Sequence, residues 1–125
     1  MDAESIRELF QEFGPVEVHR MFGGAGIFVE GRMIGLVSRD VIYLKTDAET
    51  IPAFKQEGLA PFGYATKNGE RKLTSYWRIP DRLYDDPGEL ARWGRDAHSA
   101  AQRAAMRKTS RKPVMPKSSE KKKRR

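Results

Sequence analysis

The sequence contains no cysteine. Disulfide frameworks, thiolate zinc sites, iron–sulfur clusters and cysteine nucleophiles are therefore excluded. Histidine is nearly as scarce, with only His19 and His98, and no metal-ligand spacing surrounds either one. Three nearby aspartates, Asp81, Asp85 and Asp86, are not followed by a calcium-loop pattern. We therefore expect no metal and no other cofactor.

Long apolar runs are also missing. No segment approaches the roughly 18 apolar residues of a membrane span, and the N-terminus is charged from Asp2 onward, without the apolar stretch of a signal peptide. We expect a cytoplasmic protein that does not contact membranes. The serines have no nucleophile-elbow context, and no motif places a histidine beside an acid. We therefore expect no enzyme.

Positive charge is concentrated at the C-terminal end. The 125 residues carry a net charge of +7, yet residues 107–125 alone hold ten Lys and Arg against Glu120, which leaves a net −2 for residues 1–106. Apolar residues nearly vanish beyond Arg107, so the sequence predicts a domain at 1–107 and a disordered basic tail at 108–125. Such a tail could bind the phosphate backbone of nucleic acid without sequence preference. Its candidate residues are Lys108, Arg111, Lys112, Lys117, Lys121, Lys122, Lys123, Arg124 and Arg125.

The first half of the domain reads as one helix, four strands and a second helix. Apolar residues at helical spacing predict a helix that ends at Gly14-Pro15. Strand-like segments then follow with only short turns between them, which predicts an antiparallel meander. A short helix is expected from about Thr50 to Glu57, with Gly58 as its stop.

The second half adds a hairpin and a third helix. Asn68-Gly69 is a strong hairpin-turn dipeptide between two strand-like segments. Asp86-Pro87-Gly88-Glu89 has the residues of a helix start, and the helix could run to about Met106. The sequence therefore predicts an α+β fold in two layers. An antiparallel sheet of about six strands carries the helices on one face, in the order α-β-β-β-β-α-β-β-α.

The segment from Arg20 to Phe28 is rich in glycine. Glycine-rich loops that cradle phosphates lead from a strand into a helix, whereas these glycines join strand to strand. A structural turn that needs positive φ or close backbone approach is the favoured interpretation. The residues of this predicted turn are Arg20, Met21, Phe22, Gly23, Gly24 and Gly26.

Aromatic residues gather on the predicted hairpin, where Tyr76 and Trp77 accompany Phe62 and Tyr64. Aromatics on a sheet can stack on bases, as in the RRM fold. Neither RNP signature of that fold occurs here, so core packing or an oligomer interface is favoured over base stacking.

These features together resemble the TfoX N-terminal domain family, also called Sxy-like, of bacterial competence regulators. The resemblance covers roughly residues 1–100. It rests on Arg20-Met21-Phe22-Gly23-Gly24, Gly26-Ile27-Phe28, Gly31, Met33, Tyr43-Leu44-Lys45, Asp47, Phe54, Gly58, Pro61-Phe62, Tyr64, Ser75-Tyr76-Trp77, Pro80, Asp86-Pro87, Leu90 and Trp93.

The resemblance implies a compact α+β domain with an antiparallel sheet and a regulatory role, and it supplies no catalytic residues. TfoX proteins promote expression of DNA-uptake genes together with a cyclic-AMP-responsive activator. They also carry a C-terminal helical domain, in place of which this chain has its basic tail, so we expect a stand-alone N-terminal domain.

Three hypotheses about function follow. The leading one is a non-enzymatic regulatory or adaptor protein, linked to transcriptional or competence regulation, that binds an unidentified protein partner. The alternative is a protein that associates with nucleic acid through its tail. A weaker third is an enzyme acting on a small ligand beside the glycine-rich turn. Exposed sheet edges would also suit a homodimer.

Overall fold

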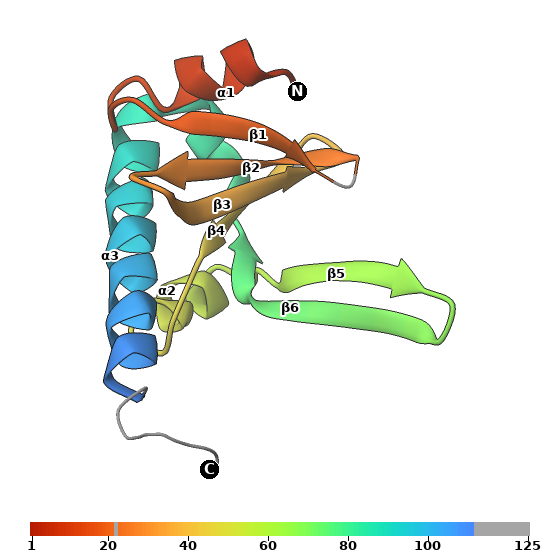
Figure 1. Ribbon diagram of the computed structural model, residues 1–125. Helices are drawn as coiled ribbons and strands as arrows, with labels where there is room; N and C mark the ends of the chain where they lie inside the picture. The colour runs from red at the N-terminus through yellow and green to blue at the C-terminus, as the bar shows by residue number, and fades with distance from the viewer. Residues whose placement is uncertain (22, 112–125) are drawn as a thin grey trace.

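The computed structural model describes residues 1–21 and 23–111, and it has the α+β architecture that the sequence predicts. The elements run in the expected order, with one addition, a short 3-10 helix before the last α-helix (Figure 1). They are α1 (Ala3–Leu9), β1 (Glu17–Met21), β2 (Gly24–Val29), β3 (Arg32–Ser38), β4 (Val41–Lys45), α2 (Ile51–Gln56), β5 (Pro61–Thr66), β6 (Gly69–Arg78), η1 (Asp81–Asp85) and α3 (Pro87–Arg111).

The six strands form one antiparallel sheet in the order β1-β2-β3-β4-β6-β5. The first four strands are a meander, as the short turns between them predict. The β5–β6 hairpin joins this meander through β6, which pairs with β4 over Tyr76–Arg78. The register shifts between β2 and β3, where Ile34 is an extra residue between the pairs Ile27–Gly35 and Phe28–Met33. The outer strands of the sheet are β1 and β5.

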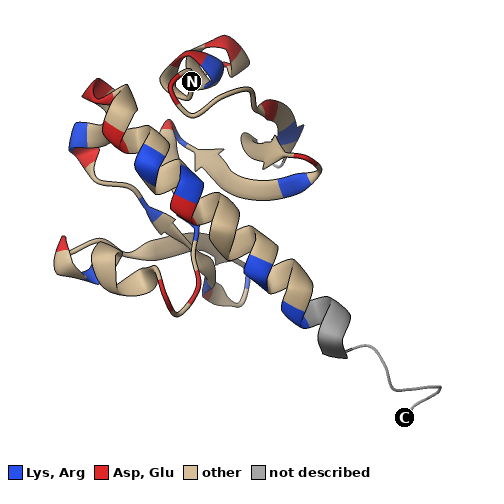
Figure 2. Ribbon diagram, turned by 90° about the vertical axis from the view of Figure 1, so that its left-hand side faces the viewer, with Lys and Arg blue, Asp and Glu red and all other residues tan. Residues whose placement is uncertain are grey.

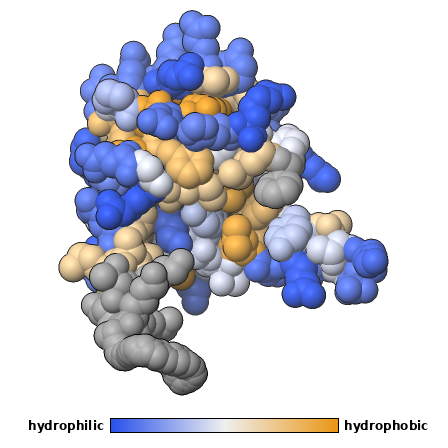
Figure 3. Space-filling model, in the orientation of Figure 1, coloured by the Kyte–Doolittle hydropathy of each residue, from blue (hydrophilic) through white to orange (hydrophobic). Residues whose placement is uncertain are grey.

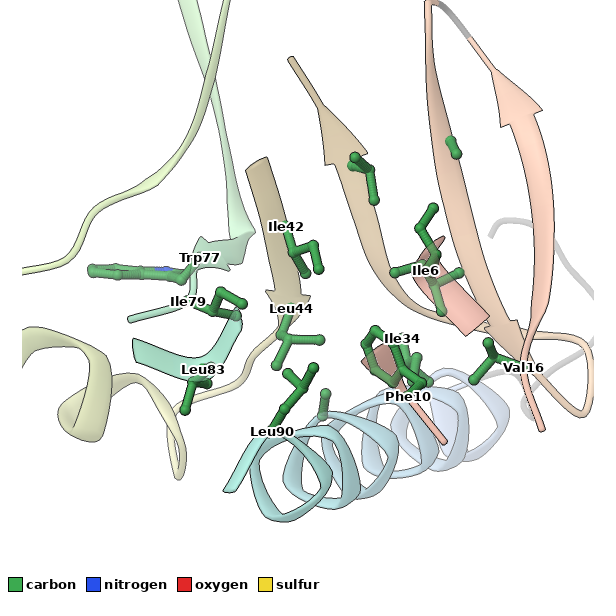
Figure 4. Packing of buried hydrophobic residues seen from close by; sticks show 14 of the residues in the cluster. Ile6, Phe10, Val16, Ile34, Ile42, Leu44, Trp77, Ile79, Leu83 and Leu90 are labelled. Atoms are coloured by element: carbon green, nitrogen blue, oxygen red, sulfur yellow. The ribbon is translucent and has the colours of Figure 1, made fainter. Parts of the chain in front are cut away.

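All three α-helices pack on one face of the sheet. Ile6 of α1, Phe10 directly after α1, Phe54 of α2 and Leu90 of α3 belong to one buried cluster. The strands add inward-facing residues to that cluster, including Ile27, Val37, Ile42, Leu44, Trp77 and Ile79. Figure 4 shows this core between α3 and the sheet. Burial of these side chains at roughly 1.5–3 kcal/mol each is the main stabilising term of the fold.

The last helix is longer than the sequence predicts. Its start agrees, because Asp86 Oδ1 accepts a hydrogen bond from the Glu89 amide at 3.1 Å and so caps the first turn. Its end lies at Arg111, so residues 108–111, which the sequence analysis places in the disordered tail, are helical. The alanines at 100, 101, 104 and 105 and the basic residues after them favour helix. Pro113 is the first residue beyond Arg111 that cannot continue it.

The β5–β6 hairpin projects from the rest of the molecule (Figure 1). Six residues of β6, Gly69–Leu73 and Trp77, pair with β5, whereas only Tyr76–Arg78 pair with β4. Leu73, although it alternates with inward-facing residues in the sequence, is 38% exposed because it lies on the projecting part. None of the helices of the described chain has the length and apolar character needed to cross a membrane.

Candidate functional site

The face of the sheet opposite the helices carries apolar and aromatic side chains. We call it the open face, because no helix of the described residues covers it (Figure 1). Strand alternation places on it Met21 of β1, Phe28 of β2, Met33 and Leu36 of β3, Tyr43 of β4, and Phe62 and Tyr64 of β5. In Figure 3 hydrophobic colours lie in the middle of the molecule, between the hydrophilic α1 end and the hydrophilic hairpin tip.

Three of these side chains converge over Gly26, and we call them the methionine cluster: Met21, Phe28 and Met33. A Cβ atom at Gly26 would lie 2.8 Å from Phe28 Cε1, 3.1 Å from Met33 Sδ and 3.3 Å from Met21 Cε. The missing side chain of Gly26 therefore leaves the space in which they meet. The His19 ring packs edge-on against Phe28, with the ring centroids 4.9 Å apart.

At the other two glycines of the motif, Gly23 and Gly24, the backbone geometry requires glycine. Gly23 has a φ of 78°, in the left-handed region that favours glycine. A Cβ at Gly24 would lie 2.1 Å from the carbonyl oxygen of Val37, so only glycine permits this approach of β2 to β3. Arg20 is exposed beside them, and Phe22 lies outside the described residues. The motif thus builds a strand-to-strand turn and, through Met21 and Gly26, part of the open face.

A second group on the open face is the aromatic row, Tyr43, Phe62 and Tyr64. The ring centroids of Tyr43 and Phe62 lie 4.9 Å apart, and those of Phe62 and Tyr64 lie 5.8 Å apart. Tyr64 is 45% exposed. The sequence groups Phe62 and Tyr64 with Tyr76 and Trp77, but the structure separates them. Trp77 belongs to the core and Tyr76 is buried, whereas the row remains accessible.

Cations accompany the aromatic row. In the strand pairing, Arg71 is opposite Tyr64 and Arg78 is opposite Tyr43, so each shares the open face with its neighbour. Lys45 Nζ lies 5.2 Å from the centre of the Tyr76 ring, a cation–π contact. Burial lowers the pKa of Lys45, and the charge of Arg107 on α3 lowers this pKa further. The two cations are therefore close enough to repel each other.

A cavity of about 310 Å³ lies beside this region, between α2 and α3. Phe54 and Trp93 form part of its wall, with ring centroids 4.8 Å apart. Its polar rim is engaged in internal ion pairs, since Arg103 Nε lies 2.6 Å from Asp47 Oδ2 and 3.2 Å from Glu49 Oε2. These hydrogen bonds lower the pKa of Asp47 and raise the pKa of Arg103. The charge of Arg103 is thus neutralised by Asp47 and Glu49.

The residues that the sequence considers for metal chemistry are not brought together. His19 lies on β1, 3.2 Å from Glu17 Oε1, and His98 lies on α3, 3.8 Å from Glu30 Oε1. In residues 1–21 and 23–111, no three His, Cys, Asp or Glu side chains form a group that could hold a metal ion. Asp86 caps α3, and Asp81 pairs with Arg78 at 3.5 Å.

The basic candidates at the C-terminal end fall into two groups. Lys108 and Arg111 lie in the last turns of α3, which Figure 2 shows as a long helix with Lys and Arg spaced along it. Lys112, Lys117, Lys121, Lys122, Lys123, Arg124 and Arg125 lie outside the described residues.

A match to a family model identifies the protein family of this chain. The model of the TfoX N-terminal domain matches residues 8–101. The chain belongs to the TfoX N-terminal domain family. The TfoX N-terminal domain match spans the whole sheet, and with it the methionine cluster and the aromatic row. A comparison with curated proteins finds no match.

Sequence reasoning missed the open face of this TfoX N-terminal domain. The apolar segment from Met33 to Val37 correctly indicates a central strand, but it does not tell which face a helix covers. A usable signal was the alternation of Tyr43 with Leu44, because large side chains on both faces of a strand cannot all be covered by helices that pack on one face.

Proposed function

We propose that this TfoX-family domain is a non-enzymatic regulatory adaptor that binds a protein partner through the methionine cluster. One observation carries the proposal: Met21, Phe28 and Met33 converge over Gly26 on a sheet face without a helix. Methionine side chains are flexible and polarizable, which suits them to adaptable protein contacts, and methionine and aromatic residues are enriched at interfaces.

The family supports a regulatory role for the domain. We propose that the regulated process is competence or, more broadly, transcription, since TfoX proteins of this family promote expression of DNA-uptake genes. The open face supplies an apolar contact surface rather than a nucleophile and base held by a third group, which favours binding over catalysis. The expected homodimer through an edge strand stays a prediction, and light scattering of the purified chain would measure it.

The protein contact can be tested with side chains of matched size. In the double variant Met21→Gln/Met33→Gln the side chains keep their length but lose their apolar character. Met106→Gln is the control, because Met106 is 68% exposed on α3 and is not part of the methionine cluster. Each tagged full-length chain is used to capture proteins from nuclease-treated lysate of the source cells. We expect the same proteins with the parent and the control, and their loss with the double variant.

The regulatory role needs a separate readout. Transcripts are compared in source cells that lack the chain and are complemented with the parent, the control or the double variant. We expect the parent and Met106→Gln to restore the transcript pattern and the double variant to fail. Capture and transcripts that are unchanged in the double variant would contradict the role of the methionine cluster.

A further inference from the structure

The cavity between α2 and α3 has an apolar inner wall. Its volume is about 310 Å³, and Figure 1 shows α2 beside the lower half of α3. The most buried side chains that line it are Phe54 at 3% and Ala97 at 2% exposure, with the half-buried Trp93 beside them. The rings of Phe54 and Trp93 meet edge to face. A cavity of this size with an aromatic wall is within the range of small-ligand sites.

Two charged residues that line the cavity, Lys45 and Asp96, are not paired. Neither forms a salt bridge within the part of the chain that the structure describes, whereas Arg103 holds the carboxylates of Asp47 and Glu49. Asp96 attracts Arg103 only from a longer distance. Lys45 is half-buried and Asp96 is exposed. The cavity therefore offers a ligand one cation and one anion.

The two charges lie toward opposite ends of the cavity. Lys45 lies near the Arg103 end, because its charge also interacts with that of Arg107, one turn further along α3. Asp96 precedes Arg103 by seven residues, which is about 10 Å along the helix axis at roughly 1.5 Å per residue. An extended peptide advances about 3.3–3.6 Å per residue, so about three residues cover this separation.

The charges and the apolar wall together select the ligand. A simple anion would leave Asp96 without a partner and would also approach the carboxylate of Glu49. A simple cation would meet Lys45, whose ammonium is already partly removed from water. A zwitterion satisfies both groups. A short peptide with free termini carries its two charges at its ends and can place a side chain between them, against Phe54 and Trp93.

We propose that this cavity binds a zwitterionic peptide of about three residues. Its ammonium group lies at Asp96, its carboxylate at Lys45 and an apolar side chain against Phe54 and Trp93. This site goes beyond the proposed protein contact and does not depend on it. The methionine cluster belongs to β1, β2 and β3, whereas the cavity lies between two helices that pack on the other face of the sheet. Failure of one proposal therefore leaves the other intact.

The test follows the indole N–H signals of the ¹⁵N-labelled full-length chain by NMR while the peptide Gly-Phe-Gly is added. The sequence has two tryptophans, so two indole signals are expected, and a Trp93→Phe variant assigns them. Trp93 lines the cavity, whereas Trp77 belongs to the core and does not line it. We expect the signal of Trp93 to shift in a saturable way and that of Trp77 to shift much less. An unmoved Trp93 signal at millimolar peptide would overturn the proposal.

Blocked peptides test the two charges on the unmodified chain. N-terminal acetylation removes the ammonium group, and C-terminal amidation removes the carboxylate. Because Asp96 is exposed, we expect acetylation to weaken binding only about threefold. Because Lys45 is half-buried, we expect amidation to weaken binding about tenfold. Equal affinity for the free peptide and for either blocked peptide would count against the proposal and overturn it.

Two variants assign each terminus to its partner. Asp96→Asn should bind the free and the acetylated peptide equally well and still discriminate against the amide. Lys45→Gln should bind the free peptide and the amide equally well and still discriminate against the acetylated peptide. The dispersion of the amide signals shows that each variant is folded.

The matched controls are Asp85→Asn and Lys55→Gln, which change exposed residues outside the cavity. Both should discriminate among the three peptides as the parent does. If Asp96→Asn or Lys45→Gln also kept the parent's pattern of discrimination, the proposal would be overturned.

Discussion

The Asp47 carboxylate accepts hydrogen bonds from Arg103 Nε at 2.6 Å and from Arg103 Nη2 at 3.1 Å, across 56 residues of sequence. The same carboxylate accepts the backbone N–H of Glu49 at 3.0 Å and thus also holds the turn before α2. Its side chain is only 5% exposed. One carboxylate therefore ties the end of β4 to the start of α2 and to α3.

This arrangement predicts a pH-dependent contribution to stability. The hydrogen bonds from Arg103 lower the pKa of Asp47 in the folded chain. Because this pKa is lowered, the contribution of Asp47 to stability is fully present above its pKa in the unfolded chain, about 3.9. The contribution is lost as the pH falls through the pKa of Asp47 in the folded chain. Asp47→Asn should therefore melt below the parent at pH 7, and the difference in Tm should shrink as the pH falls below about 4.

The control for this prediction is Asp85→Asn, which changes an exposed aspartate on η1. Glu57 and Glu89 also have lowered pKa values because Arg82 donates to both, so the parent loses stability in acid for several reasons. The difference between parent and Asp47→Asn isolates one carboxylate. A difference in Tm that stays constant down to pH 2 would contradict the assignment.

Alanine substitutions at Gly24 and at Gly26 should lower the stability of the fold to different extents. At Gly24 the new Cβ would meet the Val37 carbonyl, which is backbone, so we expect a loss of about 1–3 kcal/mol in the free energy of unfolding. At Gly26 it would meet only side-chain atoms of the methionine cluster, which can shift, so the loss should be smaller. Urea denaturation of the two variants gives the order. The reverse order would mean that β2 and β3 are not this close.

The Tyr84 hydroxyl accepts a hydrogen bond from the Ile42 amide at 2.9 Å and so joins η1 to β4. Tyr84→Phe removes the acceptor and leaves a half-buried N–H without its partner. We expect a loss of about 1–3 kcal/mol in unfolding free energy, measured by urea denaturation. Tyr64→Phe is the matched control, because the Tyr64 hydroxyl has no hydrogen bond within the described residues. Equal stability of the two variants would count against this bond.

The turn between β3 and β4 should accept a stabilising change. Arg39 and Asp40 have φ values of 53° and 62°, a left-handed conformation that costs most residues about 1 kcal/mol but suits asparagine. Arg39→Asn should therefore raise the Tm by a few degrees. Lys67→Asn, in the β5–β6 turn where φ is not positive, should bring no such gain. A thermal melt of the two variants decides between these outcomes.

Folding should not require a metal ion. The chain has no cysteine, and its described residues hold no group of metal-binding side chains. Dialysis against EDTA should leave the Tm unchanged. A clear drop in the Tm that a divalent ion reverses would show a metal site that the described residues do not contain.

The local elements of this fold could be predicted because local residues determine them. Gly58 and Asp86 mark helix ends wherever the rest of the chain lies, and short turns leave antiparallel pairing as the only choice for the first four strands. The first helix ends at Leu9, before the predicted stop at Gly14-Pro15, so that prediction was wrong. The predicted end of α3 was wrong because a run of charged residues also suits a disordered tail, although arginine and lysine are good helix formers.

The candidate sites depend on contacts that span the sequence. The pairing of β4 with β6 brings Tyr43 to Phe62, and no residue pattern within either strand encodes that choice. The Asp47–Arg103 pair likewise depends on where α3 crosses the sheet. The glycine motif predicts a turn, but the gap that Gly26 leaves beneath three side chains becomes apparent only once β3 lies beside β2.

The pairing of β6 with both β4 and β5 also predicts that two parts of the molecule move separately. Only Tyr76–Arg78 of β6 pair with β4, so the distal hairpin can separate from β4 while the core cluster stays packed. Amides of Phe62–Thr66 should therefore exchange through local opening, with a lower free energy than amides of β3, which open only with the whole domain. The hairpin is then an independent unit of motion, and its rings can change position on a faster timescale than the methionine cluster can.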